Sequence, residues 1–124
     1  MRFGYTIVYV DDVAATIAFY EKAFGQQRGM VAGDEFGELK TGETKLGFAA
    51  KKMLHGEGQF ASPEGKVLGV EIAFVTGDVQ KAYDTAVAAG AKSVSKPEKK
   101  PWGQIVAYVR DNNGFLVELC TPTG

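Results

Sequence analysis

Residues 109–119 read Val109-Arg110-Asp111-Asn112-Asn113-Gly114-Phe115-Leu116-Val117-Glu118-Leu119. Two apolar runs flank a polar cluster that ends in Gly114. This arrangement predicts a β-hairpin, because Asn and Gly tolerate the positive φ angles of tight turns. Successive side chains of a strand point to opposite faces, so Phe115, Val117 and Leu119 should share one face. Glu118 should then lie on the other face, with Leu116 and Cys120.

Glu118 is the unusual residue of this strand. An ionised carboxylate is seldom fully buried unless it is paired, bound to a metal or turned toward a polar cavity. Two interpretations are open at this point: a strand with one solvated face, and a strand that lines a pocket.

Length and composition predict one globular domain of ordinary type. The chain has 124 residues, of which 45% are hydrophobic, and 14 basic against 15 acidic residues give a net charge of −1. This balance argues against nucleic-acid binding, and no apolar run reaches the ~18 residues of a membrane span. The single Cys120 excludes an internal disulfide, and the first residues lack the pattern of a signal peptide. We therefore expect a soluble cytoplasmic protein with no membrane partner.

The first part of the chain predicts a strand, a helix and three further strands. The helix 13–24 has apolar residues at helical spacing, with Asp11 or Asp12 as its N-cap and Gly25 after its end. Alternating apolar patterns predict the strands 3–10, 27–31, 36–41 and 44–50.

The same order then repeats after a break at 51–66, a Gly- and Pro-containing segment that carries the single histidine, His55. Asp78 caps a second predicted helix, 79–89, which ends at Gly90. The accompanying strands are predicted at 67–76, 91–95, 102–110 and 115–120, with the charged, Pro-interrupted segment 96–101 as a loop.

Two copies of one β-α-β-β-β order indicate an internal duplication. Placing Asp12 over Asp78 puts Tyr5 on Glu71 and Gly47 near Glu118. The sequence thus predicts an α+β fold in one domain, 1–124, with module 1 at 1–50, a linker at 51–66 and module 2 at 67–124. The two sheets should form an open, incomplete mixed β-barrel, with the helices on its convex face.

The open face of such a barrel would carry the side chains that point away from the helices. Tyr5, Glu71 and Glu118 belong to it, and Cys120 has the same parity as Glu118. The aromatic and acidic character of this face suits a planar or cationic organic molecule. The ligand-binding residues that we predict are Tyr5, Tyr9, Gly47, Glu71, Trp102, Tyr108 and Glu118, with Gly47 leaving room for the ligand.

The chain resembles the vicinal oxygen chelate superfamily, which groups glyoxalase I, bleomycin-resistance proteins, extradiol dioxygenases and fosfomycin-resistance enzymes. The resemblance covers nearly the whole chain. It is carried by Val10-Asp11-Asp12 before Ile17-Ala18-Phe19-Tyr20 and Phe24-Gly25, and then by Ala88-Ala89-Gly90-Ala91, Pro101-Trp102-Gly103, Asp111-Asn112-Asn113-Gly114 and Val117-Glu118-Leu119.

The resemblance implies where metal ligands would lie in the metal-dependent members. The matching positions of this chain are Tyr5, Gly47, Glu71 and Glu118, and of these only Glu118 fits the pattern. The two carboxylates Glu71 and Glu118 could still bind a hard cation. We interpret His55 as a surface loop residue without a ligand role.

Three functions follow as alternatives. The first, which we favour, is metal-free binding or sequestration of a small aromatic cation by a homodimer, as in the bleomycin-resistance branch with its antibiotic-resistance role. The second is a glyoxalase-like lyase, isomerase or dioxygenase with a degenerate site, in which Glu71 and Glu118 hold one divalent metal ion. The third is a domain that acts mainly through its dimer surface. The sequence does not decide whether the protein is an enzyme.

Overall fold

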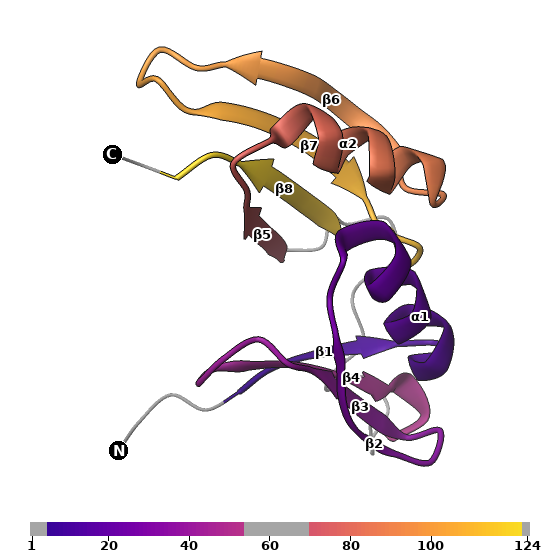
Figure 1. Cartoon of the computed structure of the whole chain (residues 1–124). Helices are drawn as coiled ribbons and strands as arrows, with labels where there is room; N and C mark the ends of the chain where they lie inside the picture. The colour runs from indigo at the N-terminus through magenta and orange to yellow at the C-terminus, as the bar shows by residue number, and fades with distance from the viewer. Residues whose placement is uncertain (1–4, 54–69, 123–124) are drawn as a thin grey trace. The chain divides into compact units, whose positions relative to one another are not determined.

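The computed structural model describes residues 5–53 and 70–122. The chain divides into two compact units, Met1–Val67 and Leu68–Gly124, coloured indigo to magenta and orange to yellow in Figure 1. The elements of the first unit are β1 (Tyr5–Val10), α1 (Val13–Phe24), β2 (Arg28–Ala32), β3 (Phe36–Leu39), β4 (Lys45–Ala50) and the short 3-10 helix η1 (Lys51–Met53). Those of the second unit are β5 (Glu71–Val75), α2 (Val79–Ala88), β6 (Lys92–Lys99), β7 (Ile105–Arg110) and β8 (Leu116–Cys120).

This order confirms the predicted α+β fold with two β-α-β-β-β modules. We call β1–β4 with α1 the first module and β5–β8 with α2 the second module. Most of the predicted linker lies outside the described residues, and so does the beginning of the predicted strand 67–76.

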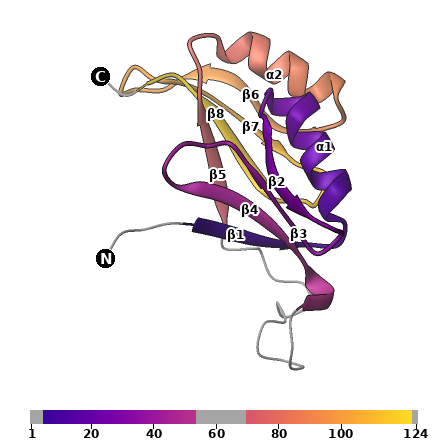
Figure 2. The same cartoon turned by 60° about the horizontal axis from the view of Figure 1, so that its bottom comes forward.

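Each module forms one open, mixed four-stranded sheet, in the orders β1-β4-β3-β2 and β5-β8-β7-β6 (Figure 2). β1 pairs with β4, and β5 with β8, in parallel, whereas the other pairs are antiparallel. In the β1–β4 pair, Tyr5 is opposite Lys45, and two residues later the partner strand reaches Gly47. In the β5–β8 pair, Glu71 is opposite Leu116, and two residues later the partner strand reaches Glu118. The registers therefore support the predicted equivalence of Tyr5 with Glu71 and of Gly47 with Glu118.

The helices begin and end where the sequence predicts, to within one residue. The Asp12 carboxylate accepts a hydrogen bond from the Ala15 amide at 2.9 Å, and Asp78 accepts one from the Lys81 amide at 3.0 Å. Each carboxylate thereby satisfies one backbone donor of the first helical turn. Gly25 ends α1 with a φ of 63°, a left-handed conformation that favours glycine.

The core of the first module lies between α1 and the sheet. α1 contacts β3 and β4, and the ring centroid of Tyr20 is 4.9 Å from that of Phe48. The closest approach is at Gly37 of β3, where an added Cβ would overlap Ile17 Cδ1 and lie 3.3 Å from Val13 Cγ1. Glycine at this position therefore allows α1 to pack directly on the strand backbone.

The core of the second module follows the predicted alternation of β8. Phe115, Val117 and Leu119 are buried, and α2 packs against β6, β7 and β8. Tyr83 of α2 is also buried, and its hydroxyl donates a hydrogen bond to Ser93 Oγ at 2.7 Å. The tyrosine thus joins the helix to β6 without an unsatisfied polar group.

The hairpin between β7 and β8 is organised by Asp111. Its buried carboxylate accepts hydrogen bonds from the amides of Asn113 and Phe115, each at 2.8 Å. Gly114 has a φ of 85°, as a tight turn of this kind requires.

Two boundary predictions in the second module are wrong. The segment 96–101 is not wholly a loop, because β6 continues through Pro97 to Lys99. β6 is an edge strand, where a proline without an N–H is tolerated, and an irregularity between Ser95 and Glu98 accommodates it. The strand predicted from Trp102 begins only at Ile105, since residues 101–103 form a turn.

Neither α1 nor α2, the helices of the described residues, is long and apolar enough to cross a membrane.

Candidate functional site

Two glutamates of neighbouring strands lie together on the second module. Ala73 of β5 is opposite Glu118 of β8, and Glu71 is two residues before Ala73, so both carboxyl groups occupy the sheet face that points away from α2. Burial, the negative charge of Glu71 and a side-chain hydrogen bond with Glu71 all raise the pKa of Glu118. Two carboxyl groups can share such a bond only when one of them holds a proton.

Tyr108 and Cys120 border this pair. Tyr108 of β7 is directly opposite Glu118, and Cys120 follows Glu118 on the same face. Burial and the charges of Glu118 and Glu71 raise the pKa of the Tyr108 phenol and that of the Cys120 thiol. Both groups are therefore protonated at neutral pH. The buried thiol, which donates to the Phe74 carbonyl oxygen at 3.7 Å, is not activated as a nucleophile.

No lysine or arginine neutralises the acidic pair within the described parts of the chain, whose ion pairs involve neither glutamate. Arg110, on the same face as Glu118, donates to the carbonyl oxygen of Gly114 at 3.0 Å. The face around Glu71 and Glu118 consequently has unbalanced negative charge when both are ionised.

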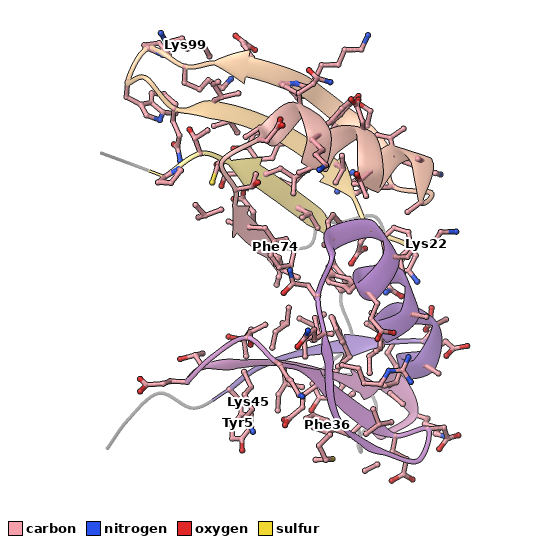
Figure 3. The ribbon with its side chains drawn as sticks, viewed as in Figure 1. Tyr5, Lys22, Phe36, Lys45, Phe74 and Lys99 are labelled. Carbon is pink, nitrogen blue, oxygen red and sulfur yellow. The ribbon has the colours of Figure 1, made fainter. Side chains whose placement is uncertain are left out.

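The first module places an aromatic stripe on the equivalent face. Tyr5, Ile7 and Tyr9 of β1 are 56%, 46% and 37% exposed, as their alternation with the buried Val8 and Val10 predicts. Tyr5 and Lys45 lie beside each other on the side of the sheet away from α1 (Figure 3).

Gly47 does not leave open space, contrary to the sequence-based prediction. A Cβ at Gly47 would lie 2.9 Å from Cζ of Phe36, whose ring occupies the position above the glycine. Phe36 carries no signal of this role in the sequence, because side-chain alternation does not show which neighbour fills the space above a glycine.

Glu38 of β3 is a buried carboxylate that is not among the site residues predicted from the sequence. Its Oε1 accepts a hydrogen bond from Lys45 Nζ at 3.1 Å, and its side chain is 7% exposed against 43% for that of Lys45. Glu38 is opposite Gly47, just as Tyr108 is opposite Glu118. The parity argument used for Glu118 would have identified it, since Glu38 is the acidic residue of an otherwise apolar strand.

Trp102 lies in the turn between β6 and β7. Its side chain is 67% exposed, and its indole Nε1 donates to Gln104 Oε1 at 2.9 Å. Of the predicted ligand-binding residues, the structure thus brings together Glu71, Tyr108 and Glu118 on the second module, and Tyr5, Tyr9 and Gly47 on the first. One pocket common to all of them stays a prediction.

The described residues do not form a complete metal centre. Glu71 and Glu118 supply oxygen ligands, but within 5–53 and 70–122 no three His, Cys, Asp or Glu side chains are grouped where they could hold a metal ion. Divalent cations are usually held in proteins by more ligands than two carboxylates. His55 lies outside the described residues.

Comparison with known proteins agrees with this architecture. Residues 2–119 match the sequence profile described as "Glyoxalase/Bleomycin resistance protein/Dioxygenase superfamily". No curated protein matches the chain at a significant level.

Similar solved structures include a glyoxalase/bleomycin resistance protein/dioxygenase family enzyme from Burkholderia phytofirmans PsJN, with 25% identity, a TM-score of 0.80 and coverage of 95% of this chain and 96% of that one. TioX from Micromonospora sp. ML1 has 22% identity and a TM-score of 0.74, with 98% of both chains covered. Lactoylglutathione lyase from Agrobacterium tumefaciens has 21% identity and a TM-score of 0.73, with 98% and 94% covered. The chain belongs to the glyoxalase/bleomycin resistance protein/dioxygenase superfamily, also known as the vicinal oxygen chelate superfamily.

Proposed function

We propose that this protein binds a small aromatic cation on the face of the second module that carries Glu71 and Glu118, and sequesters it without chemical change. The observation that carries this proposal is the contact between the two carboxyl groups, which raises the pKa of Glu118. A site where like charges crowd each other gains the most from a ligand of opposite charge.

The preference for a cation has a simple electrostatic basis. A ligand ammonium or amidinium group would make charge-assisted hydrogen bonds to the ionised pair, each worth about 1.5–3 kcal/mol. An anion of the same shape would meet repulsion instead. The proton that Glu118 retains at low pH competes with the cationic ligand, so affinity should fall as the pH is lowered.

The preference for an aromatic ligand rests on Tyr108. Its ring is half-buried opposite Glu118, and the raised pKa keeps its phenol neutral at pH 7. A neutral ring beside two carboxylates offers both stacking area and cation–π attraction.

The first module offers an instructive contrast. Its buried carboxylate, Glu38, is neutralised by Lys45 of the same sheet at 3.1 Å, whereas Glu118 is not paired with any base among the described residues. An external cation would therefore offset unbalanced charge on the second module, whereas the first module has its own lysine for this purpose.

The test is a thermal-shift and calorimetric titration with benzamidine, as an aromatic cation, and benzoate, as its anionic counterpart. Wild-type protein should bind benzamidine in preference. Glu118→Gln keeps the shape of the side chain and removes its charge, and should weaken benzamidine binding about ten- to a hundredfold, since ~1.4 kcal/mol corresponds to a factor of ten. Tyr108→Leu should weaken it by a smaller factor.

Glu98→Gln is the matched control, because Glu98 is an exposed glutamate of the same sheet and should leave benzamidine binding unchanged. Equal responses to benzamidine and benzoate, or an unaltered affinity in Glu118→Gln, would refute the proposal. Elemental analysis of gently purified protein addresses the metal-dependent alternative. One divalent metal ion per chain would favour a lyase or dioxygenase activity, as in some superfamily members.

A further inference from the structure

The Glu38–Lys45 pair of the first module is unequally exposed. The Glu38 side chain is 7% exposed and that of Lys45 43%, although their charged atoms are 3.1 Å apart. The negative end is thus enclosed in the sheet face, while the positive end remains accessible to solvent. Such a pair is neutral in total charge, yet it presents an ammonium group outward.

The surroundings of Glu38 hold it in place. A Cβ at Gly29 would lie 3.3 Å from Glu38 Cγ, so the absence of a side chain at Gly29 leaves space for the carboxylate stem. On its other side, β3 pairs with β4, where Glu38 is opposite Gly47. The ring of Phe36 lies above this glycine. The confined carboxylate thereby gives the Lys45 ammonium one hydrogen-bond partner at a defined place on the sheet.

Lys45 retains hydrogen-bonding capacity beyond this contact. An ammonium group has three N–H donors, and Glu38 Oε1 accepts one of them. Tyr5 is the strand partner of Lys45, and its phenol oxygen is near enough to contribute, after Glu38, to the raised pKa of the lysine. The ammonium therefore stays charged at neutral pH, beside a hydroxyl that can also donate a hydrogen bond.

An apolar surface extends along β1 from the Lys45 ammonium and the Tyr5 hydroxyl. Ile7 and Tyr9 follow Tyr5 on the same face and are 46% and 37% exposed. A fixed cation and a hydroxyl at one end of an aromatic and aliphatic stripe match a molecule with an anionic group at one end of a flat apolar body. The more exposed ammonium of the pair therefore favours an acid over a base as the ligand of this face.

We infer that Lys45, positioned by Glu38 and assisted by Tyr5, forms a binding subsite for an aromatic carboxylate on the first module. This inference concerns the first module alone and does not rest on the Glu71–Glu118 site. Lys45 and Tyr5 contact the carboxylate, whereas Glu38 holds the ammonium beside the sheet in the free protein and competes with the ligand for it. The competing explanation is that the ion pair only joins β3 to β4.

The experiment is an NMR titration of the full chain with benzoate and, as its neutral counterpart, benzamide. Benzoate should shift the backbone amides of Tyr5, Lys45 and Gly47 more strongly than benzamide does. Lys45→Met should weaken benzoate binding about tenfold or more, corresponding to the loss of one charge-assisted contact. Lys45→Arg should remain within about threefold of wild type, since the charge is kept.

Glu38→Gln separates the two explanations. Removal of the carboxylate that competes for Lys45 should raise benzoate affinity by about three- to tenfold, whereas a purely structural pair would give no gain and only lower stability. Lys52→Met is the matched control, because Lys52 pairs with Asp34 at 2.7 Å on the same module and should leave benzoate binding unaltered.

Lys45→Met alone leaves Glu38 buried without its cation and is therefore at risk of misfolding. The double variant Glu38→Gln/Lys45→Met removes both charges and should fold, with benzoate binding weakened as in the single variant. The inference is overturned if benzamide binds as benzoate does, if the folded double variant retains wild-type affinity, or if Glu38→Gln binds benzoate no more tightly than wild type.

Discussion

At the scale of single residues, Glu118 shows how a strand can hold an acid that is only partly accessible to water. It lies beside Glu71 on one face of β8, while Val117 and Leu119 are buried on the other. Desolvation and a neighbouring carboxylate both disfavour the ionised form. The sequence predicts the face of Glu118 from alternation alone.

The raised pKa of Glu118 makes stability depend on pH. Between the ordinary value of 4.5 and the raised pKa, the folded state binds more protons than the unfolded state. The free energy of unfolding therefore falls as pH rises through this window, and this loss of stability is complete above the raised pKa. We expect Glu118→Gln to raise the midpoint of thermal unfolding at pH 7 and to leave it unaltered near pH 4.

Thermal unfolding monitored by circular dichroism across pH 4–8 measures this difference. Glu98→Gln is the control, because this glutamate is exposed and should give the same shift at every pH. A Glu118→Gln variant that is less stable than wild type at pH 7 would indicate that the ionised side chain stabilises the fold.

Several residue-level features could not be predicted from the sequence because they depend on contacts between strands. Phe36 fills the space above Gly47, and the register that places them together is not encoded in either residue. The pairing of Glu38 with Lys45 depends equally on the antiparallel register of β3 and β4. Alternation predicts which face a side chain occupies, but not which neighbour it contacts.

At the scale of elements, the helices were the easiest to predict and the edge strand β6 was the hardest. Asp12, Asp78 and Gly25 satisfy local rules of helix capping, which act within one turn of the chain. β6 continues through Pro97, against local preference, because it pairs with β7 on one side only. Local rules therefore suffice for the helix ends and fail at β6.

The contact between α1 and β3 gives a prediction at this scale. Gly37→Ala adds a methyl group that overlaps Cδ1 of the buried Ile17 and cannot be accommodated without moving α1. We expect the free energy of unfolding to fall by about 1–3 kcal/mol, the usual cost of overpacking a core. Denaturant unfolding of Gly37→Ala and wild type measures this difference in the free energy of unfolding.

Gly77→Ala is the matched control, since nothing lies within 4 Å of a Cβ added there. Its effect should be within about 0.5 kcal/mol of zero. The double variant Ile17→Val/Gly37→Ala should recover part of the lost stability, because valine lacks the Cδ1 atom that the new methyl meets. Equal stability of Gly37→Ala and wild type would show that α1 can shift at no cost.

At the scale of the whole molecule, each sheet has edge strands whose backbone groups pair on one side only, namely β1 and β2 in the first module and β5 and β6 in the second. Unpaired strand edges and the exposed apolar side chains Met30, Val31 and Val94 favour association. We therefore expect a homodimer in solution. Sedimentation at micromolar concentration measures its mass, and a monomer would contradict the prediction.

The duplicated architecture has a consequence for how the protein can evolve. A dimer of identical single modules would acquire each substitution twice, once in each sheet. Here the two copies are joined in one chain, so a change in one copy leaves the other as it was. The corresponding positions differ in charge: Tyr5 is opposite Lys45 in the first module, and Glu71 is opposite Leu116 in the second. Two modules in one chain are thus not bound by symmetry, and each can carry its own charge independently of the other.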